Sequence, residues 1–188
     1  MMTAFLADVR RYSGRDPSLR TVIGAVARNY GAQGLLVYRL GRFLVRASRD
    51  WRLIAMASIC WPVYLPLRWY VRYALGIRLD LSAEIGAGFY IGHLGNIHLE
   101  RCTLGRNCSI GQSTHIMPLR GGRGPSIGDH VWIGAHARII GPHSIGSGST
   151  VSAGGVVCQD VPAGAMCLGD PARVVARQYD NRRLLGLD

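Results

Sequence analysis

The stretch Ile127-Gly128-Asp129-His130-Val131-Trp132-Ile133-Gly134-Ala135-His136-Ala137-Arg138-Ile139 carries the pattern that decides the fold. From its first residue an aliphatic side chain recurs at every sixth position, at Ile127, Ile133, Ile139, Ile145, Val151 and Val157. A period of six matches neither the helical period of about 3.6 residues nor the strand alternation of about two. A short strand followed by a sharp turn, repeated, produces it, and the glycine that often follows the aliphatic residue supplies the freedom of the turn.

The same spacing extends upstream, which makes thirteen hexads in all. The earlier positions are Leu79, Ile85, Ile91 and Ile97 and, after a slip of one residue, Leu104, Ile110 and Ile116. A single coil of this kind cannot bury its apolar face, so the coils must stack on one another. Chance spacing in another strand-rich fold is the alternative, and six consecutive matches in one phase disfavour it. We therefore predict a mainly β fold in which residues 77–161 form a left-handed parallel β-helix of hexapeptide repeats.

One longer step interrupts the repeat between Ile116 and Ile127, which lie eleven residues apart. The intervening segment, residues 117–126, contains three glycines, two prolines and two arginines, and this composition predicts an extruded loop. Loops on a rigid scaffold often carry function. A tolerated insertion without function is the alternative.

Composition separates an N-terminal region from the repeat. The chain has 188 residues, enough for one domain with an appendage, and no lysine. Residues 1–78 carry 13 arginines against three aspartates, so most of the net charge of +11 belongs to them. The five cysteines are odd in number and form no Cys-x-x-Cys pair, and no secretory signal opens the chain. We expect a reducing, cytoplasmic location.

Residues 1–76 are predicted to be α-helical and to resemble a membrane-surface segment. Apolar residues and arginines form two stripes at helical spacing over residues 34–50, with Arg39, Arg42, Arg46 and Arg49 in the basic stripe. Residues 53–67 carry no charge, but a transmembrane helix needs about 20 residues, and Pro62 and Pro66 are expected to break the helix. We expect residues 34–72 to bind an anionic surface, the inner face of the bacterial plasma membrane.

Two other uses of this basic region were considered. A buried helical hairpin, packed on the β-helix or on a trimer mate, is the alternative to membrane contact. Nucleic acid is not expected as a partner, because no recognisable reading motif accompanies the arginines.

Histidine is the commonest general base near neutral pH, and six histidines are candidates. They are His93, His98, His115, His130, His136 and His143. His93 stands out because Gly92 and Gly95 flank it and leave room for a ligand. By spacing alone, each of the six is more often a surface or structural residue than a catalytic one.

The sequence Ile91-Gly92-His93-Leu94-Gly95-Asn96-Ile97 resembles the histidine-bearing coil of the serine acetyltransferase family, hexapeptide-repeat acyltransferases that use acetyl-CoA. Similar stretches occur at residues 15–17, 38–40, 121–125, 133–141 and 169–175. The short, basic N-terminal region is more similar to the colanic-acid type of exopolysaccharide acetyltransferase. Two departures from serine acetyltransferases are that Arg78 stands where the family has its catalytic acid, and Gly124 where its loop has a histidine that helps to hold serine.

The resemblance implies direct acetyl transfer in a ternary complex. His93 would remove the proton from the acceptor hydroxyl, and Asp80 would orient the imidazole. The resemblance further implies acceptor contacts by Arg123, Gly121, Gly122 and His115 and acetyl-CoA contacts by Ala135, Ser152, Ala153, Gly154, Pro171 and Arg173. It also implies that residues 162–188 close the CoA site and that the protein is a homotrimer with active sites between protomers.

A saccharide acceptor, in a precursor of an exopolysaccharide or lipopolysaccharide, is expected from this resemblance. Serine, for cysteine biosynthesis, is the alternative acceptor. A non-catalytic membrane-associated scaffold protein is an alternative of another class. A zinc enzyme resembling γ-type carbonic anhydrase needs three converging histidines. His93 and His98 could supply a pair, but the third histidine of that family lies well upstream, and residues 1–92 contain none, so no metal is expected.

Overall fold

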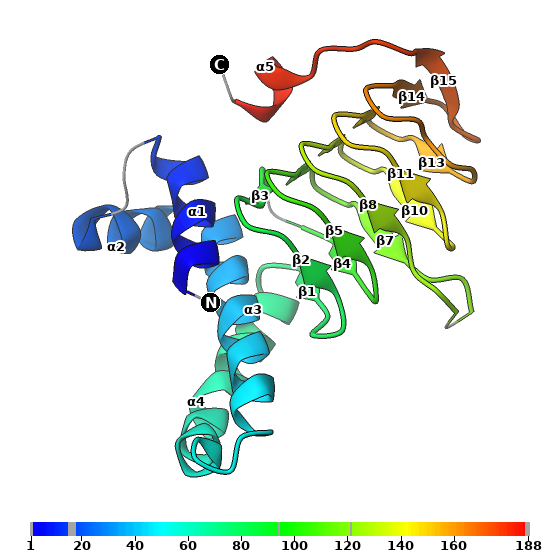
Figure 1. The fold of residues 1–188 in the computed structure, drawn as a ribbon. Coiled ribbons are helices and arrows are strands. Elements are labelled where there is room, and N and C mark those ends of the chain that lie inside the picture. The colour runs from blue at the N-terminus through cyan, green and yellow to red at the C-terminus, as the bar shows by residue number, and fades with distance from the viewer. Residues whose placement is uncertain (1, 15–17, 94, 121, 187–188) are drawn as a thin grey trace.

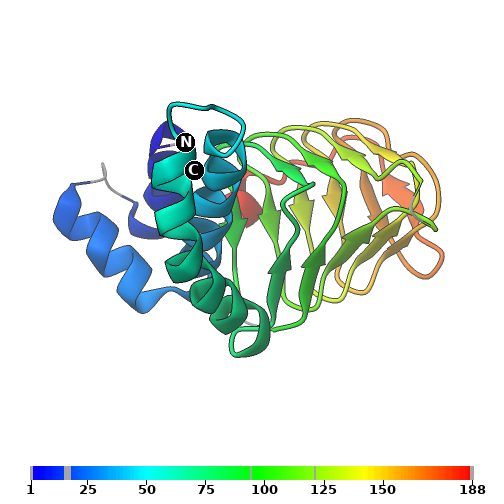
Figure 2. The ribbon, with the colours of Figure 1, turned by 90° about the horizontal axis from the view of Figure 1, so that it is seen from below.

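The computed structural model describes residues 2–14, 18–93, 95–120 and 122–186. Short parallel strands wind into a triangular prism, so the predicted parallel β-helix is confirmed (Figures 1 and 2). We call its three sheets side A, side B and side C, in the order in which the chain visits them. An α-helical region closes one end of the prism, next to β1, β2 and β3 (Figure 1).

The strands of each side stack in chain order. Side A contains β1 (Ile77–Leu79), β4 (Ile97–Leu99), β7 (His115–Met117), β10 (Arg138–Ile140) and β13 (Val156–Val157). Side B contains β2 (Glu84–Ile85), β5 (Thr103–Leu104), β8 (Ser126–Ile127) and β11 (Ser144–Ile145). Side C contains β3 (Tyr90–Ile91), β6 (Ser109–Ile110), β9 (Trp132–Ile133), β12 (Thr150–Val151), β14 (Met166–Leu168) and the antiparallel β15 (Arg173–Ala176).

The core of the prism consists of the aliphatic residues of the repeat, with one change of register. On side A, Leu99 rather than Ile97 pairs with Ile116, and both Ile97 and Leu99 are fully buried. The step from Ile91 to Leu99 is therefore eight residues, and the following step to Leu104 is five. Relative to the regular step of six residues, the first step is two residues longer and the second is one residue shorter. Together they produce the one-residue slip in the repeat. The corner between β3 and β4, which holds His93, is thus longer than the corner of a regular coil.

Glycine at the corners lets successive coils approach closely. A Cβ atom on Gly134 would lie 2.4 Å from the backbone nitrogen of Ala153 in the next coil. Such a distance is too short for any side chain, so the recurring glycine is required by stacking as well as by the turn.

Four helices form the N-terminal region: α1 (Met2–Ser13), α2 (Leu19–Arg28), α3 (Tyr30–Ala47) and α4 (Ile54–Tyr73). Ser18 caps the start of α2, where its hydroxyl accepts a hydrogen bond from the backbone N–H of Thr21. The pair α3 and α4 forms a helical hairpin whose loop end extends away from the prism (Figure 1).

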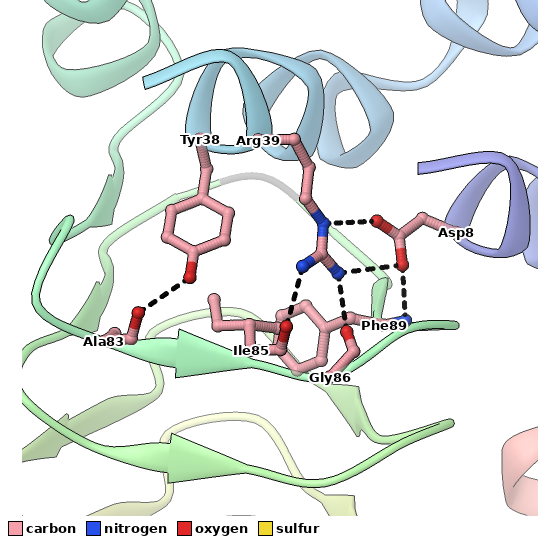
Figure 3. A network of polar contacts seen from close by, with 7 residues as sticks. All are labelled: Asp8, Tyr38, Arg39, Ala83, Ile85, Gly86 and Phe89. Carbon is pink, nitrogen blue, oxygen red and sulfur yellow. Dashed lines mark hydrogen bonds and ion pairs between the residues drawn. The ribbon is translucent and has the colours of Figure 1, made fainter. Parts of the chain in front are cut away.

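A buried ion pair fastens α1 and α3 to the first coil (Figure 3). The Arg39 guanidinium donates to both carboxylate oxygens of Asp8 and to the carbonyl oxygens of Ile85 and Gly86. Asp8 also accepts from the backbone N–H of Phe89. We call these contacts the Asp8–Arg39 clasp. Arg39 is only 8% exposed, so the expectation that it belongs to an exposed basic stripe is wrong.

The prolines of α4 do not end the helix, contrary to the sequence-based expectation. The helix continues through Pro62 and Pro66 and is held against α3 by the buried side chains of Ala57, Tyr64 and Val71. A proline inside a helix removes the amide donor to the carbonyl four residues earlier, and packing of this seam offsets the loss. None of the helices within the described residues has the length and apolarity needed to cross a membrane.

The C-terminal segment leaves the prism at β15 and runs back along it to the helical region (Figure 1). The Asn181 amide donates to the carbonyl oxygens of His130 and Ser149, at corners between sides B and C. The segment ends in α5 (Arg182–Leu185), where Arg11 of α1 donates to the carbonyl oxygen of Leu185.

Candidate functional site

His93 lies in the long corner between β3 and β4, where its side chain is exposed. The end of this corner is turned by Gly95 and Asn96, both with positive φ angles. Because the corner holds two residues more than a regular coil, it projects from the prism. Among the described residues, none forms a hydrogen bond with the His93 imidazole, whose ring lies at the surface beside a cavity.

The cavity beside His93 has a volume of about 400 Å³ and opens between the prism and the helices. Its wall combines hydroxyl, amide, guanidinium and imidazole groups, a set suited to a small polar molecule. The lining residues are Tyr12, Arg28, Asn29, Tyr30, Gly31, Tyr90, Ile91, Gly92, His93 and Gln112.

Tyr12 of α1 holds the strand that leads to His93. Its hydroxyl accepts from the Ile91 N–H at 2.9 Å and donates to the Ile91 carbonyl oxygen at 3.3 Å. Burial raises the pKa of Tyr12, so its hydroxyl stays protonated and can make both bonds. A Cβ atom on Gly31 would lie 2.4 Å from that hydroxyl, so only glycine lets α3 approach here. The wall of the cavity is therefore rigid.

The corners between sides C and A stack into one edge of the prism, which we call the His93 edge. It consists of residues 92–93, 95–96, 111–114, 134–137 and 152–155, and residues 169–172, the turn between β14 and β15 of side C, continue it through hydrogen bonds with Val156. Backbone hydrogen bonds join successive corners, from Ser113 N–H to the Gly95 carbonyl, from His136 to Gln112 and from Gly154 to Ala135. Strands in a sheet are about 4.8 Å apart, so this edge extends roughly 19 Å from His93 to its far end.

Most residues predicted to bind the cofactor lie on this edge. Ala135 occupies one corner, and Ser152, Ala153 and Gly154 occupy the next. Pro171 lies in the last corner, which is fixed by the hydrogen bond from Ala172 N–H to the Val156 carbonyl, and Arg173 begins β15 directly after it. Of the predicted closing segment 162–188, this corner lies on the His93 edge, whereas Asn181 contacts the edge between sides B and C.

Asp80 lies apart from the His93 cavity. It follows β1 and lines a separate pocket of about 290 Å³ that is also lined by Arg68, Arg72 and His98. Burial raises the pKa of Asp80, but hydrogen bonds from Ser82 and the charges of Arg68 and His98 outweigh that effect and hold it below its ordinary value. The structure therefore pairs this carboxylate with other groups, and His93 is not among its described hydrogen-bond partners.

The residues predicted to hold the acceptor lie on other parts of the prism. His115 is on side A, where its ring is 6.2 Å from that of His98. Gly122 and Arg123 are exposed in the loop between β7 and β8, at the edge between sides A and B. Gly122 N–H donates to the Leu119 carbonyl within that loop. Gly121 lies outside the described residues. A single chain thus does not bring this loop to His93, which occupies another edge.

Sequence reasoning missed the contribution of the helices to this site. Arg28 ends α2, and its side chain lines the His93 cavity together with Tyr30 and Gln112. The break between α2 and α3 at Asn29 was the available signal, but nothing in the sequence shows that it lies against β3. Within the described residues, no cluster of three or more His, Cys, Asp or Glu side chains is placed to hold a metal ion.

Comparison with known proteins gives one consistent result. The chain is 29% identical to the serine acetyltransferase of Mycobacterium tuberculosis over 94% of its own length and 74% of that relative. Its fold matches soybean serine acetyltransferase complexed with serine at a TM-score of 0.74 and 31% identity, covering 92% of this chain and 68% of the soybean chain. A serine acetyltransferase in complex with CoA matches at a TM-score of 0.73 and 25% identity, with 92% and 68% covered. No family model matches the chain.

These relatives correct the expected acceptor. The prediction of a saccharide acceptor is wrong, because the relatives and structural neighbours are serine acetyltransferases. The short, basic N-terminal region, which suggested the exopolysaccharide type, folds as helices that the serine acetyltransferase structures also match, since 92% of this chain is covered.

Proposed function

Because this chain belongs to the serine acetyltransferase family, we propose that it transfers an acetyl group from acetyl-CoA to the hydroxyl of serine. The single observation that supports this most strongly is the His93 edge, where a histidine beside a polar cavity heads a row of corners that contains the residues predicted to bind the cofactor. Such a transfer needs a base, a cavity for a small acceptor and an extended surface for acetyl-CoA, which the His93 edge offers.

In the proposed reaction, serine and acetyl-CoA are bound together. A nitrogen of His93 removes the proton from the serine hydroxyl, and the oxygen attacks the thioester carbonyl. The tetrahedral intermediate then collapses, the carbon–sulfur bond breaks, and the imidazolium returns its proton to the CoA sulfur. O-acetylserine and CoA leave. General bases of this kind contribute roughly 10²- to 10⁴-fold to the rate.

Arg28 is the group in the cavity best suited to the serine carboxylate. Among the described residues that line the cavity it is the only arginine, and a guanidinium binds a carboxylate with two parallel hydrogen bonds. Tyr30 and Gln112 add a hydroxyl and an amide for the amino group. These side chains come from α2, α3 and the corner after β6, so the helical region completes the acceptor site.

We also propose a homotrimer in which a neighbour's loop completes each site. His93 and Arg123 occupy different edges of one prism, so a single chain leaves them apart. Rotation about a three-fold axis brings the edge between sides A and B of one protomer toward the His93 edge of the next. Arg123, which is exposed, then reaches the acceptor or the thioester from the partner.

Acetyl-CoA is proposed to lie along the His93 edge. Its thioester is placed at His93, and its pantetheine arm passes the corners at Ala135 and at Ser152–Gly154, where backbone groups are the available partners. Arg173, exposed beyond the last corner, is suited to the phosphates. We propose a cytoplasmic location, in keeping with five cysteines that form no disulfide.

The test is a thiol-release assay with acetyl-CoA and serine, with O-acetylserine identified by mass spectrometry. We expect turnover with L-serine and much less with threonine, whose extra methyl group must enter the same cavity. Serine lacking its carboxylate charge, as the amide, is the matched control for the Arg28 contact. Absence of O-acetylserine under saturating acetyl-CoA would overturn the proposal.

A further inference from the structure

The outer surface of α4 is apolar and is not covered by the part of the chain that the structure describes. Only Ala57, Tyr64 and Val71 are buried among its twenty residues, and their spacing of seven places them on one narrow line against α3. A helix that is apolar on nearly all sides is normally covered, either by protein or by lipid.

The exposed side chains of α4 are large. Ile59 is 75% exposed and Val63 is 65% exposed, and their spacing of four residues places them side by side on the helix, away from the line of Ala57, Tyr64 and Val71. Seven further large side chains on this helix are exposed, namely Ile54, Met56, Leu65, Leu67, Trp69, Tyr70 and Tyr73. A continuous apolar surface of this kind on a soluble domain marks an interaction site. We call it the α4 face.

Charge and aromatic residues identify the chemistry of the partner. Residues 51–79 contain four arginines and no acidic residue. The exposed large side chains in the middle of α4 are aliphatic, because Trp61 packs on the buried Tyr64, whereas the exposed Trp51 precedes the helix and the exposed Trp69 lies in its last turns. Tryptophan and tyrosine at the ends with arginine beside them are typical of segments at a lipid–water interface. Arginine near the surface also attracts anionic headgroups.

The two prolines of α4 favour a position at the lipid–water interface over one in the hydrocarbon core of a bilayer. Pro62 and Pro66 have no N–H to donate to the carbonyl oxygens of Ser58 and Pro62. A carbonyl without its helical donor is costly in hydrocarbon, but water and headgroups satisfy it at the interface. The helix therefore suits the plane of the interface, in agreement with the finding that no described helix is able to span a bilayer.

We propose that the α4 face docks on the surface of an anionic lipid bilayer, with α4 parallel to the membrane plane. A second copy of this chain fits the face less well. Two α4 helices packed by these faces would bring arginines of like sign together, and α4 itself has no acidic residue to pair with them; Asp80, the acidic residue beside Arg68, lines the pocket between α4 and the prism. The proposal is independent of the reaction at His93.

Vesicle sedimentation with the full chain tests this docking. We expect the protein to bind vesicles of phosphatidylcholine and phosphatidylglycerol in equal parts at least 10-fold more tightly than pure phosphatidylcholine, with weaker binding at high salt. The double variant Ile59→Asp, Val63→Asp should lose at least 10-fold in binding to the anionic vesicles. Light scattering of the same samples reports the oligomeric state.

The matched control is Leu168→Asp with Leu184→Asp, which adds the same charge at exposed apolar positions remote from α4. It should bind anionic vesicles as the unchanged chain does. Failure of the unchanged chain to bind, or equal binding by both double variants, would overturn the proposal. So would a smaller oligomer for Ile59→Asp, Val63→Asp alone, because a second copy would then be the occupant of the face.

Discussion

His93 is placed by an irregularity of two residues. In a regular coil the step from Ile91 would reach side A after six residues, but here Leu99 takes that place. The extra residues lengthen the corner and expose the imidazole beside the cavity formed with α1, α2 and α3. The proposed base is thus placed where the six-residue repeat is interrupted.

Replacing His93 by alanine removes the proposed base. We expect kcat to fall by about 10²- to 10⁴-fold while the dissociation constant of CoA stays unchanged. His130→Ala is the matched control, because His130 lies at a corner between sides B and C and contacts Asn107. A His93→Ala enzyme with full turnover would remove this residue from the mechanism.

Arg28→Ala tests recognition of the serine carboxylate. A hydrogen bond to a charged group contributes about 1.5–3 kcal/mol, so KM for serine should rise about 10- to 100-fold. KM for acetyl-CoA should stay the same. Arg20→Ala is the control, because it removes an exposed arginine from the same helix outside the cavity. Equal effects of the two substitutions on KM for serine would argue against a specific contact.

The sequence marks His93 as a candidate base but does not reveal which residues surround it. Its flanking glycines and its likeness to a known coil were visible, whereas Arg28 and Tyr30 reach the same cavity only through packing of α2 and α3 on the prism. Asp80 was expected beside the imidazole from the family resemblance, as a substitute for the catalytic acid whose place Arg78 takes. The turn after β1 instead directs its carboxylate to Ser82, a local hydrogen bond that spacing does not reveal.

Among the elements, the strands of the prism were the most predictable and the helices the least. The six-residue period determines which side chain of each strand is buried, because every coil repeats the same geometry. In α4 the prolines suggested a break, but helix packing on Tyr64 and Val71 outweighs the lost hydrogen bonds. Helical spacing assigned Arg39 to a surface stripe, because the sequence does not show that Asp8 of another helix binds it.

The Asp8–Arg39 clasp should stabilise the attachment of the helices to the prism. Removing one member of a buried ion pair costs about 3–5 kcal/mol, since the other charge is left without its partner. We expect Asp8→Ala to lower the melting temperature clearly at a fixed protein concentration. The double variant Asp8→Leu, Arg39→Met should be more stable than the sum of the two single losses predicts. Single variants that melt like the unchanged chain would show that the clasp contributes little.

The proposed homotrimer has active sites that are shared between protomers, with His93 from one chain and Arg123 from its neighbour. Co-expression of His93→Ala chains with Arg123→Ala chains tests this directly. In random trimers about a quarter of the sites combine an intact His93 with an intact Arg123 from the neighbour, so activity should recover to roughly that fraction. Each variant expressed alone should remain impaired, and a mixture no more active than the separate variants would contradict a shared site.

The proposed path of acetyl-CoA along the His93 edge can be measured by hydrogen–deuterium exchange of the full protein with and without CoA. We expect slower exchange at residues 111–114, 134–137 and 152–155, and unchanged exchange at residues 128–131 and 146–149 on the edge between sides B and C. Protection confined to that second edge, or no protection at any corner at saturating CoA, would contradict it.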